Sequence, residues 1–164
     1  MKKIKLLFVA IGITFGVVSL NSCKDACKDV VCQNSGTCTD GTCACLPGYT
    51  GTNCELEARE IVVGNFAVSE TCSVTGVATY SVTVSKSSTD VMKVSVAPFG
   101  GYTGATGVLK LEGTTLTLDG VNGTTLTFAS FNGTANVTGS TLNVSYSVSD
   151  GTNTETCTGT WTKQ

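Results

Sequence analysis

Six of the nine cysteines in this 164-residue chain fall within residues 27–54, at the spacing C-x4-C-x5-C-x4-C-x-C-x8-C. So short a segment cannot bury enough apolar area to offset the entropy of ordering its chain. Cross-links between the cysteines would supply the missing stability by restricting the unfolded chain. A metal cluster built on Cys43-x-Cys45 is the rival interpretation, but it needs reduced thiols, which do not persist outside the cytoplasm. The spacing therefore predicts a small disulfide-stabilised module.

The second half of this segment reads CACLPGYTGTNC and closely resembles the EGF-like module, in particular its short tenascin type. The resemblance implies a module over residues 27–54 with the disulfides Cys27–Cys38, Cys32–Cys43 and Cys45–Cys54. Calcium-binding members carry an acidic run directly before their first cysteine. Here only Lys24-Asp25-Ala26 separates Cys23 from Cys27, so we expect no calcium. The module would serve as a spacer or a contact surface, and we expect a stiff stalk.

Residues 1–22 have the composition of an export signal. Three lysines precede an uncharged stretch over residues 6–20, which is too short and too rich in glycine for a helix that spans a bilayer. The sequence LNSC, ending at Cys23, resembles the lipobox of bacterial lipoproteins. That resemblance implies cleavage before Cys23, a diacylglyceryl group on its sulfur and an acylated amine, and several acyl chains anchor a protein stably to a membrane. Ordinary signal-peptidase cleavage, with Cys23 as a structural cysteine, is the alternative.

Residues 23–26 would then form a lipidated tether. Lys24-Asp25 resembles the lysine-plus-acid tag that sends some bacterial lipoproteins to the outer face of the outer membrane. We therefore expect a surface-exposed outer-membrane lipoprotein, with the periplasmic face as the alternative.

The composition changes after the charged stretch ELEARE, which predicts a linker at residues 55–60. Residues 60–164 contain 22 Thr, 15 Val and 12 Ser but only 11 charged residues. Branched Cβ groups favour strands, and apolar residues alternate with polar ones over many short runs. We expect turns between these runs, among them Asp119–Gly123 and Asn132–Gly133. The chain is thus predicted to be mainly β, with residues 61–164 forming an antiparallel domain of eight or nine strands.

The positions of two cysteines favour a closed β-barrel over a β-sandwich, which remains the alternative. Cys72 lies at the end of the first predicted strand and Cys157 at the start of the last, so a Cys72–Cys157 disulfide would join the two edges of the sheet. Immunoglobulin-type sandwiches carry a tryptophan between their cysteines, whereas Trp161 follows the second one.

The opening Val63-Gly64-Asn65-Phe66 and the closing Trp161-Thr162-Lys163 resemble the lipocalin-like domains of small bacterial lipoproteins. Phenylalanine replaces the tryptophan of their G-x-W motif. The resemblance implies an antiparallel barrel that could hold a small apolar ligand.

The alternation also predicts which side chains face the interior of the barrel: Phe66, Val68, Tyr80, Val82, Leu142, Val144, Tyr146 and Trp161. Lipocalin-like barrels bind ligands at their mouths. Because this domain is short, we expect a narrow lumen that these side chains fill as a core. The loop that contains Phe99 and Tyr102 combines aromatic rings with flexible glycines and is the candidate contact loop for a sugar or a partner protein.

Charge and residue types exclude several classes of function. Without histidine there is no Ser-His-Asp or Cys-His catalysis and no histidine-ligated zinc. Loss of three lysines with the signal leaves 7 basic and 12 acidic groups, a net charge of −5, which argues against nucleic acid. Glu70 has inward parity, but a single carboxylate makes no catalytic pair. We therefore expect a non-enzymatic surface lipoprotein without a metal or cofactor, whose EGF-like stalk presents a barrel for protein or glycan contact. A carrier of a small apolar ligand is the alternative.

Overall fold

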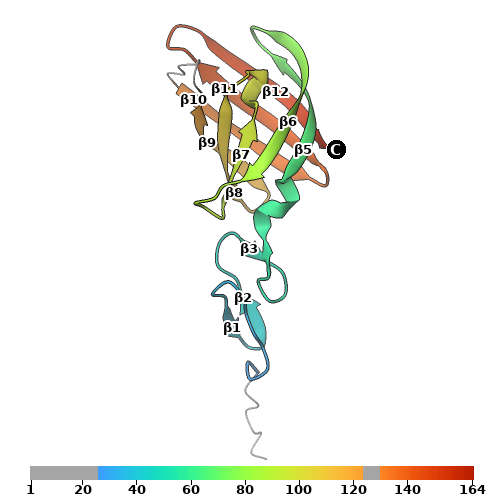
Figure 1. The fold of residues 1–164 in the computed structure, drawn as a ribbon, viewed down its shortest axis with the longest axis vertical. Helices are drawn as coiled ribbons and strands as arrows, with labels where there is room; N and C mark the ends of the chain where they lie inside the picture. Colours follow the sequence, from blue (N-terminus) through green and yellow to red (C-terminus); the bar gives the residue numbers. More distant parts are fainter. Residues whose placement is uncertain (1–25, 124–129) are drawn as a thin grey trace, which may run out of the picture.

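The computed structural model describes residues 26–123 and 130–164. A small disulfide-rich module and a β-barrel follow each other along one long axis (Figure 1). The mainly β architecture expected from the sequence is confirmed. None of the helices in the described ranges has the length and apolar character needed to cross a bilayer. The predicted signal, and Cys23 with its lipid, lie outside the described residues.

The module is held by the disulfides Cys27–Cys38, Cys32–Cys43 and Cys45–Cys54, the pairing that the EGF-like resemblance implied. Two small antiparallel sheets lie between the cross-links. β1 (Thr37–Thr39) pairs with β2 (Thr42–Ala44), and β3 (Tyr49–Thr50) pairs with β4 (Leu56–Glu57). Cys54 is fully buried, so the cross-links stand where a larger domain has its apolar core.

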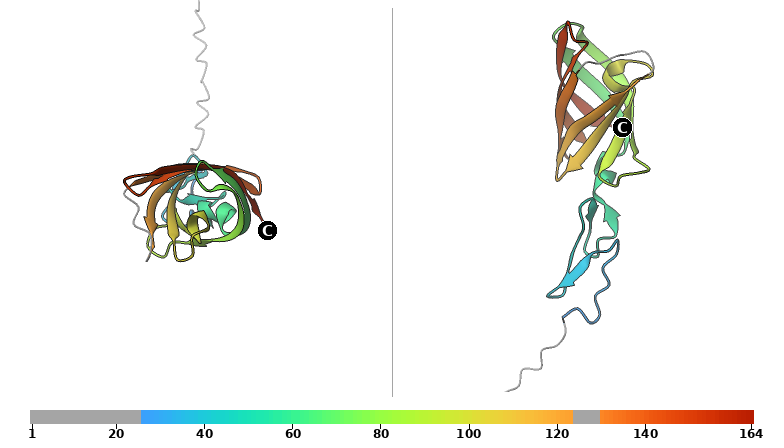
Figure 2. Two further views of the ribbon diagram at one scale, coloured as in Figure 1. Left: turned by 90° about the horizontal axis from the view of Figure 1, so that it is seen from above. Right: turned by 90° about the vertical axis from the view of Figure 1, so that its left-hand side faces the viewer.

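Eight antiparallel strands close into a barrel in which each strand pairs with its neighbours along the chain and the last pairs with the first (Figure 2). Closure overturns the sandwich alternative. The strands are β5 (Gly64–Cys72), β6 (Gly76–Lys86), β7 (Lys93–Ala97), β8 (Thr106–Glu112), β9 (Thr115–Asn122), β10 (Ser130–Thr138), β11 (Thr141–Ser149) and β12 (Thr154–Lys163).

The seam between β5 and β12 is closed by backbone pairing and by a covalent bond. Cys157 lies directly opposite Cys72 in the register of the two strands, and a disulfide joins them across 85 residues of sequence. Both cysteines are buried. The barrel therefore has no free edge at this seam, where another chain could otherwise pair.

Strict alternation along the strands builds the core of the barrel. In β5, Phe66, Val68, Glu70 and Cys72 are buried and the residues between them are exposed. The same alternation in the other strands brings their apolar side chains into one cluster, which includes Trp161 at 1% exposure. Burying each large apolar side chain stabilises the fold by about 1.5–3 kcal/mol.

Two of the predicted turns are wrong. Asn132 and Gly133 lie inside β10, where Gly133 faces Tyr146 of β11. Asp119 lies inside β9, at an irregularity where Val108 pairs with Gly120 while the next residue of β8 pairs with Leu118. Asp119 is therefore the extra residue of a β-bulge, which accommodates in a strand a residue type that usually marks a turn.

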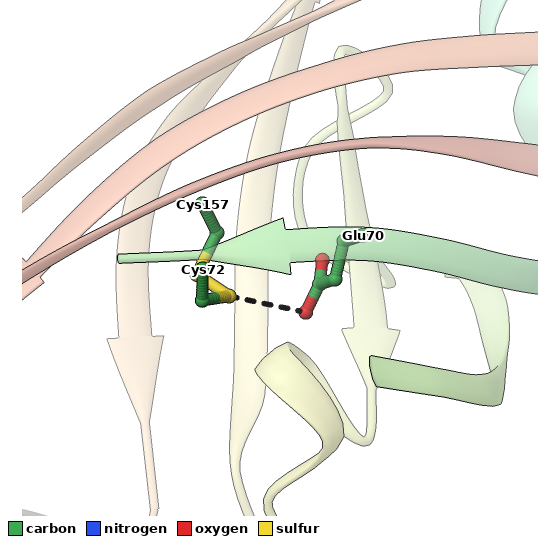
Figure 3. Close-up of side chains that lie close together, drawn as sticks. All are labelled: Glu70, Cys72 and Cys157. Carbon is green, nitrogen blue, oxygen red and sulfur yellow. Dashed lines mark hydrogen bonds between the residues drawn. A yellow bond between two sulfur atoms is a disulfide. The ribbon is translucent and has the colours of Figure 1, made fainter. Parts of the chain in front are cut away.

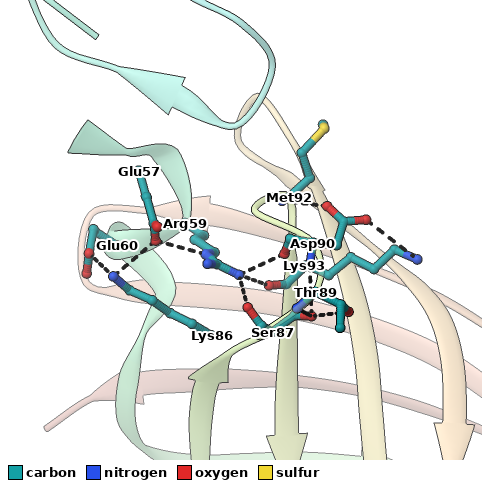
Figure 4. A network of polar contacts seen from close by, with 9 residues as sticks. All are labelled: Glu57, Arg59, Glu60, Lys86, Ser87, Thr89, Asp90, Met92 and Lys93. Carbon is teal, nitrogen blue, oxygen red and sulfur yellow. Dashed lines mark hydrogen bonds and ion pairs between the residues drawn. The ribbon is translucent and has the colours of Figure 1, made fainter. Parts of the chain in front are cut away.

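The segment between module and barrel, predicted as a linker, is an ordered junction. β4 pairs with the module, and the 3-10 helix η1 (Ala58–Val62) follows it with Arg59 and Val62 buried. Arg59 Nη1 lies 2.8 Å from the backbone oxygens of Ser87, Asp90 and Lys93 in the β6–β7 turn (Figure 4). A guanidinium can donate several hydrogen bonds at once from a rigid plane. This side chain therefore ties the junction to the near end of the barrel.

Further contacts fix the junction on both sides. Glu57 accepts a 3.0 Å hydrogen bond from Arg59 and pairs with Lys86, which also contacts Glu60. The hydrogen bonds from Arg59, and then from Lys86, hold the pKa of Glu57 below its ordinary value. On the module side, a Cβ at Gly48 would lie 2.6 Å from Cγ1 of Val91, so the two parts touch with no room for a side chain. The module and the barrel are thus held end to end.

Candidate functional site at the far mouth of the barrel

The eight side chains predicted to line the barrel lie in its core or against it. Seven of them are at most 7% exposed, and Tyr80 is partly buried and packs against the same cluster. They fill the interior, as the short domain led us to expect. The most enclosed cavity lies instead at the far mouth, which we define as the end formed by the β5–β6 turn, the β7–β8 connection and the β11–β12 turn (Figure 1).

A buried carboxylate marks this site. Glu70 of β5 is 3% exposed, and its Oε1 accepts hydrogen bonds from the hydroxyls of Tyr80, at 2.7 Å, and Tyr146, at 2.9 Å. Its Oε2 is buried and has no hydrogen-bond partner among the described residues; Trp161 Nε1 is in the same state. An unpartnered buried polar atom costs free energy, since it has lost its water without replacement. Glu70 is thus the feature of the barrel that its stability does not explain.

Both tyrosines keep their protons near Glu70. Burial raises the pKa of Tyr80, and its hydrogen bond to Glu70 raises it further. Burial also raises the pKa of Tyr146, with the charge of Glu70 as the next cause. The two hydroxyls are therefore donors at any physiological pH, and they hold Oε1 in place while Oε2 stays available.

Glycines inside strands make room for these side chains. A Cβ at Gly159 of β12 would lie 2.4 Å from the Cβ of Glu70, its cross-strand neighbour. A Cβ at Gly133 of β10 would lie 2.5 Å from the Cβ of Tyr146. Glycine in the interior of a strand commonly marks such a close approach. The two glycines are the sequence signal from which this site could have been located.

The predicted contact loop forms a cap over the far mouth, and one of its two aromatic residues is not available for contact. Phe99 in the 3-10 helix η2 (Phe99–Gly101) is 3% exposed, because its ring turns inward and packs 5.2 Å from the ring of Tyr146. Gly107 leaves the space that this ring occupies. Tyr102 is 37% exposed and remains a candidate for contact. Phe99 is therefore a core residue, and its assignment as a contact residue is corrected.

The cavity itself has a volume of about 30 Å³ and receives a second carboxylate from β12. Its lining comprises Glu70, Cys72, Thr75, Ala78, Phe99, Gly100, Tyr102, Tyr146, Val148 and Glu155. Glu155 Oε1 accepts hydrogen bonds from the amide of Thr75, at 2.8 Å, and from its hydroxyl, at 2.6 Å. Burial acts to raise the pKa of Glu155, but these hydrogen bonds outweigh it and the pKa lies below its ordinary value.

The Cys72–Cys157 disulfide forms one wall of the cavity (Figure 3). Cys72 Sγ lies 4.0 Å from Glu70 Oε1, and because a half-cystine carries no proton this approach is a contact without a donated hydrogen. The three side chains would resemble a metal-binding cluster if the cysteines were reduced. In the disulfide form they offer one carboxylate and no thiolate, which does not make a metal site.

Comparison with known proteins identifies the module. The family described as Teneurin-like EGF domain matches residues 23–57. A Neurogenic locus notch homolog protein of Giardia intestinalis is 42% identical over 60 residues, which cover 35% of this chain and 10% of that protein. Fibropellin-1 of Strongylocentrotus purpuratus is 52% identical over 44 residues, 24% of this chain and 4% of that protein. The chain thus spans a tenth or less of the curated relatives that it matches here.

For the barrel, a solved structure titled "Structure of EF1p2_mFAP2b bound to DFHBI" is 13% identical, with a TM-score of 0.48, and covers 65% of this chain and 97% of that one. The module and the barrel together describe the chain: an EGF-like module near the N-terminus, followed by a closed eight-stranded antiparallel β-barrel.

Proposed function

We propose that the protein is a non-enzymatic surface lipoprotein, anchored in the bacterial outer membrane through lipidated Cys23, whose EGF-like stalk presents the barrel for contact with a protein or glycan. An EGF-like module joined to a β-barrel fits a surface or ligand-binding protein. The anchor rests on the LNSC sequence before the module, and the absence of histidine from the sequence supports a role without catalysis.

The ordered junction carries this proposal. Arg59 and the close packing at Gly48 hold module and barrel end to end, so the far mouth lies at the end of the molecule opposite the module (Figure 1). A flexible tether would need none of these contacts. The arrangement suits a stalk that carries a head away from a surface.

The far mouth also exposes apolar side chains at the place where contact is expected. Val74 and Val77 at the β5–β6 turn are 70% and 75% exposed, and Tyr102 lies in the neighbouring cap loop. Exposed apolar groups gathered at one end of a domain are typical of interaction sites, and tyrosine is enriched in them.

The alternative, a carrier of a small apolar ligand inside the barrel, has less support. Side chains fill the interior, and a cavity of about 30 Å³ is an order of magnitude below the volume of roughly 300 Å³ or more that ligand pockets have. A fluorescent fatty-acid probe that enters the folded, oxidised protein and is displaced by unlabelled ligand would favour the carrier over the contact protein.

The contact role is tested with the purified, oxidised protein on panels of immobilised glycans and envelope proteins. Changing Val74, Val77 and Tyr102 together to serine should weaken a detected interaction at least about tenfold, since apolar anchors dominate contact energies. Val31→Ser is the matched control, because Val31 is 76% exposed but lies in the module. Equal loss in both variants, or unchanged binding in the triple variant, would refute contact through the far mouth.

A further inference from the structure

The cavity at the far mouth presents an unpartnered acceptor to its interior. Glu70 Oε2 is buried without a hydrogen-bond partner in the described part of the chain, although Oε1 of the same group accepts two hydrogen bonds. The cavity is open on the side of Tyr102, which is partly exposed. A group that enters from solvent can therefore reach a carboxylate oxygen that the protein itself leaves unsatisfied.

The far mouth also lacks any cation to balance its carboxylates. Glu70, Glu155 and Asp150 all lie at this end of the barrel. Among the residues that the structure describes, no lysine or arginine forms an ion pair with them. The basic groups of the barrel and junction contact other partners: Arg59, Lys86, Lys93 and Lys110 form ion pairs elsewhere, and Lys163 lies near the carbonyl of Ile61. Clefts with charges of one sign attract the opposite ion.

The lining distinguishes between kinds of cation. Hard metal ions such as Ca²⁺ take six to eight oxygen ligands, whereas Phe99, Val148 and the disulfide supply apolar walls here. An ammonium group needs fewer acceptors and is attracted to the faces of aromatic rings, which Phe99, Tyr102 and Tyr146 provide. The chemistry of the lining thus favours an organic cation.

The volume sets the size of the group. One water-sized group occupies about 10–15 Å³ on the same measure, so a cavity of about 30 Å³ holds roughly two. An ammonium nitrogen and the carbon attached to it meet that limit. A quaternary ammonium, with four carbons around its nitrogen, exceeds it.

We propose that this cavity binds the head of a primary amine, which donates hydrogen bonds to Glu70 Oε2 and is drawn in by the charge of Glu155. The nitrogen and its first carbon lie inside, and any longer chain leaves past Tyr102. The source is either a small free alkylamine or the end of a longer aliphatic amine. This inference is independent of the membrane anchor and goes beyond contact at the exposed rim.

The proposal is tested by titrating the ¹⁵N-labelled, oxidised full-length protein with methylammonium chloride, following the amides of Thr75, Gly100 and Tyr102. Sodium chloride at equal ionic strength is the reference. Saturable shifts confined to the far mouth are expected with methylammonium, and tetramethylammonium should produce none. Butylammonium distinguishes the sources: tighter binding than methylammonium indicates a longer amine, and weaker binding indicates a small free one.

Variants identify the acceptor. Glu70→Gln keeps the shape and the acceptor for both tyrosines but removes the charge, so affinity should fall at least about tenfold. Glu112→Gln, at an exposed glutamate paired with Lys110, should leave affinity unchanged. If Glu70→Gln does not fold, Glu155→Gln should still weaken binding severalfold. No saturable shift in the wild type, equal affinity in the glutamine variants of the cavity, or saturation by calcium chloride instead would overturn the proposal.

Discussion

The disulfide between Cys72 and Cys157 should contribute a large part of the stability of the barrel. Both cysteines are buried, and the bond closes a loop of 85 residues. In the chain-entropy model, a cross-link over that separation restricts the unfolded chain by about 4.6 kcal/mol at 25 °C. Replacing both cysteines by alanine removes this constraint without burying hydroxyls that lack partners. We expect the free energy of unfolding of the barrel to fall by about 4–5 kcal/mol.

The assay is guanidinium denaturation followed by tryptophan fluorescence. Trp161 is the single tryptophan of the chain, and it lies in the barrel core at 1% exposure, so its signal reports unfolding of the barrel alone. The matched control replaces Cys45 and Cys54 of the module by alanine, which should change this transition by less than about 0.5 kcal/mol. A loss below about 1 kcal/mol in the barrel variant, or an equal loss in the control, would show that the bond does not act by restricting the unfolded barrel.

Three further predictions concern the site and the junction. Gly159→Ala places a Cβ against Glu70 and should destabilise the barrel by about 1–3 kcal/mol in the same denaturation assay, whereas Gly120→Ala, with open space around it, should cost less than 1 kcal/mol. Arg59→Met removes the hydrogen bonds to the β6–β7 turn, and ¹⁵N relaxation should then report separate tumbling of module and barrel. The folded-state pKa of Glu155 lies below its ordinary 4.5, so this group contributes stability above pH 4.5 that is lost as the pH falls through the folded pKa. Stability measured between pH 7 and pH 3 should therefore fall less steeply in Glu155→Gln.

Each of these has a contradicting outcome. Equal effects of the two glycine variants would mean that the barrel yields at Gly159. A single correlation time in Arg59→Met would place the stiffness of the junction in other contacts. An unchanged pH slope in Glu155→Gln would remove that carboxylate from the acid sensitivity of the fold.

The cysteines and the alternation in the sequence predicted most of the fold. The spacing over residues 27–54 led to the EGF-like module, and the alternating apolar residues with Cys72 and Cys157 at the ends led to a closed barrel. Both signals are local or covalent, so they survive without knowledge of the tertiary structure. The turn predictions at Asn132–Gly133 and at Asp119 failed because these residue types usually mark turns, whereas here packing and a bulge keep them in strands.

The site was only partly predictable. Parity placed Glu70, Tyr80 and Tyr146 inside the barrel, yet whether the three meet depends on strand tilt and register, which no local pattern encodes. The inward turn of Phe99 depends on the space left by Gly107 in another strand. A carboxylate flanked by inward aromatic residues and opposed by strand glycines is the pattern that could have indicated the site.

The state of the nine sulfur atoms tests the proposed surface lipoprotein most directly. Mass spectrometry of the native, membrane-extracted protein should find an N-terminus at Cys23 that carries a diacylglyceryl group and an amide-linked acyl chain. The other eight cysteines should all resist alkylation until they are reduced. An unmodified Cys23, an N-terminus elsewhere, or free thiols among the eight would contradict a lipid-anchored, disulfide-stapled stalk and head.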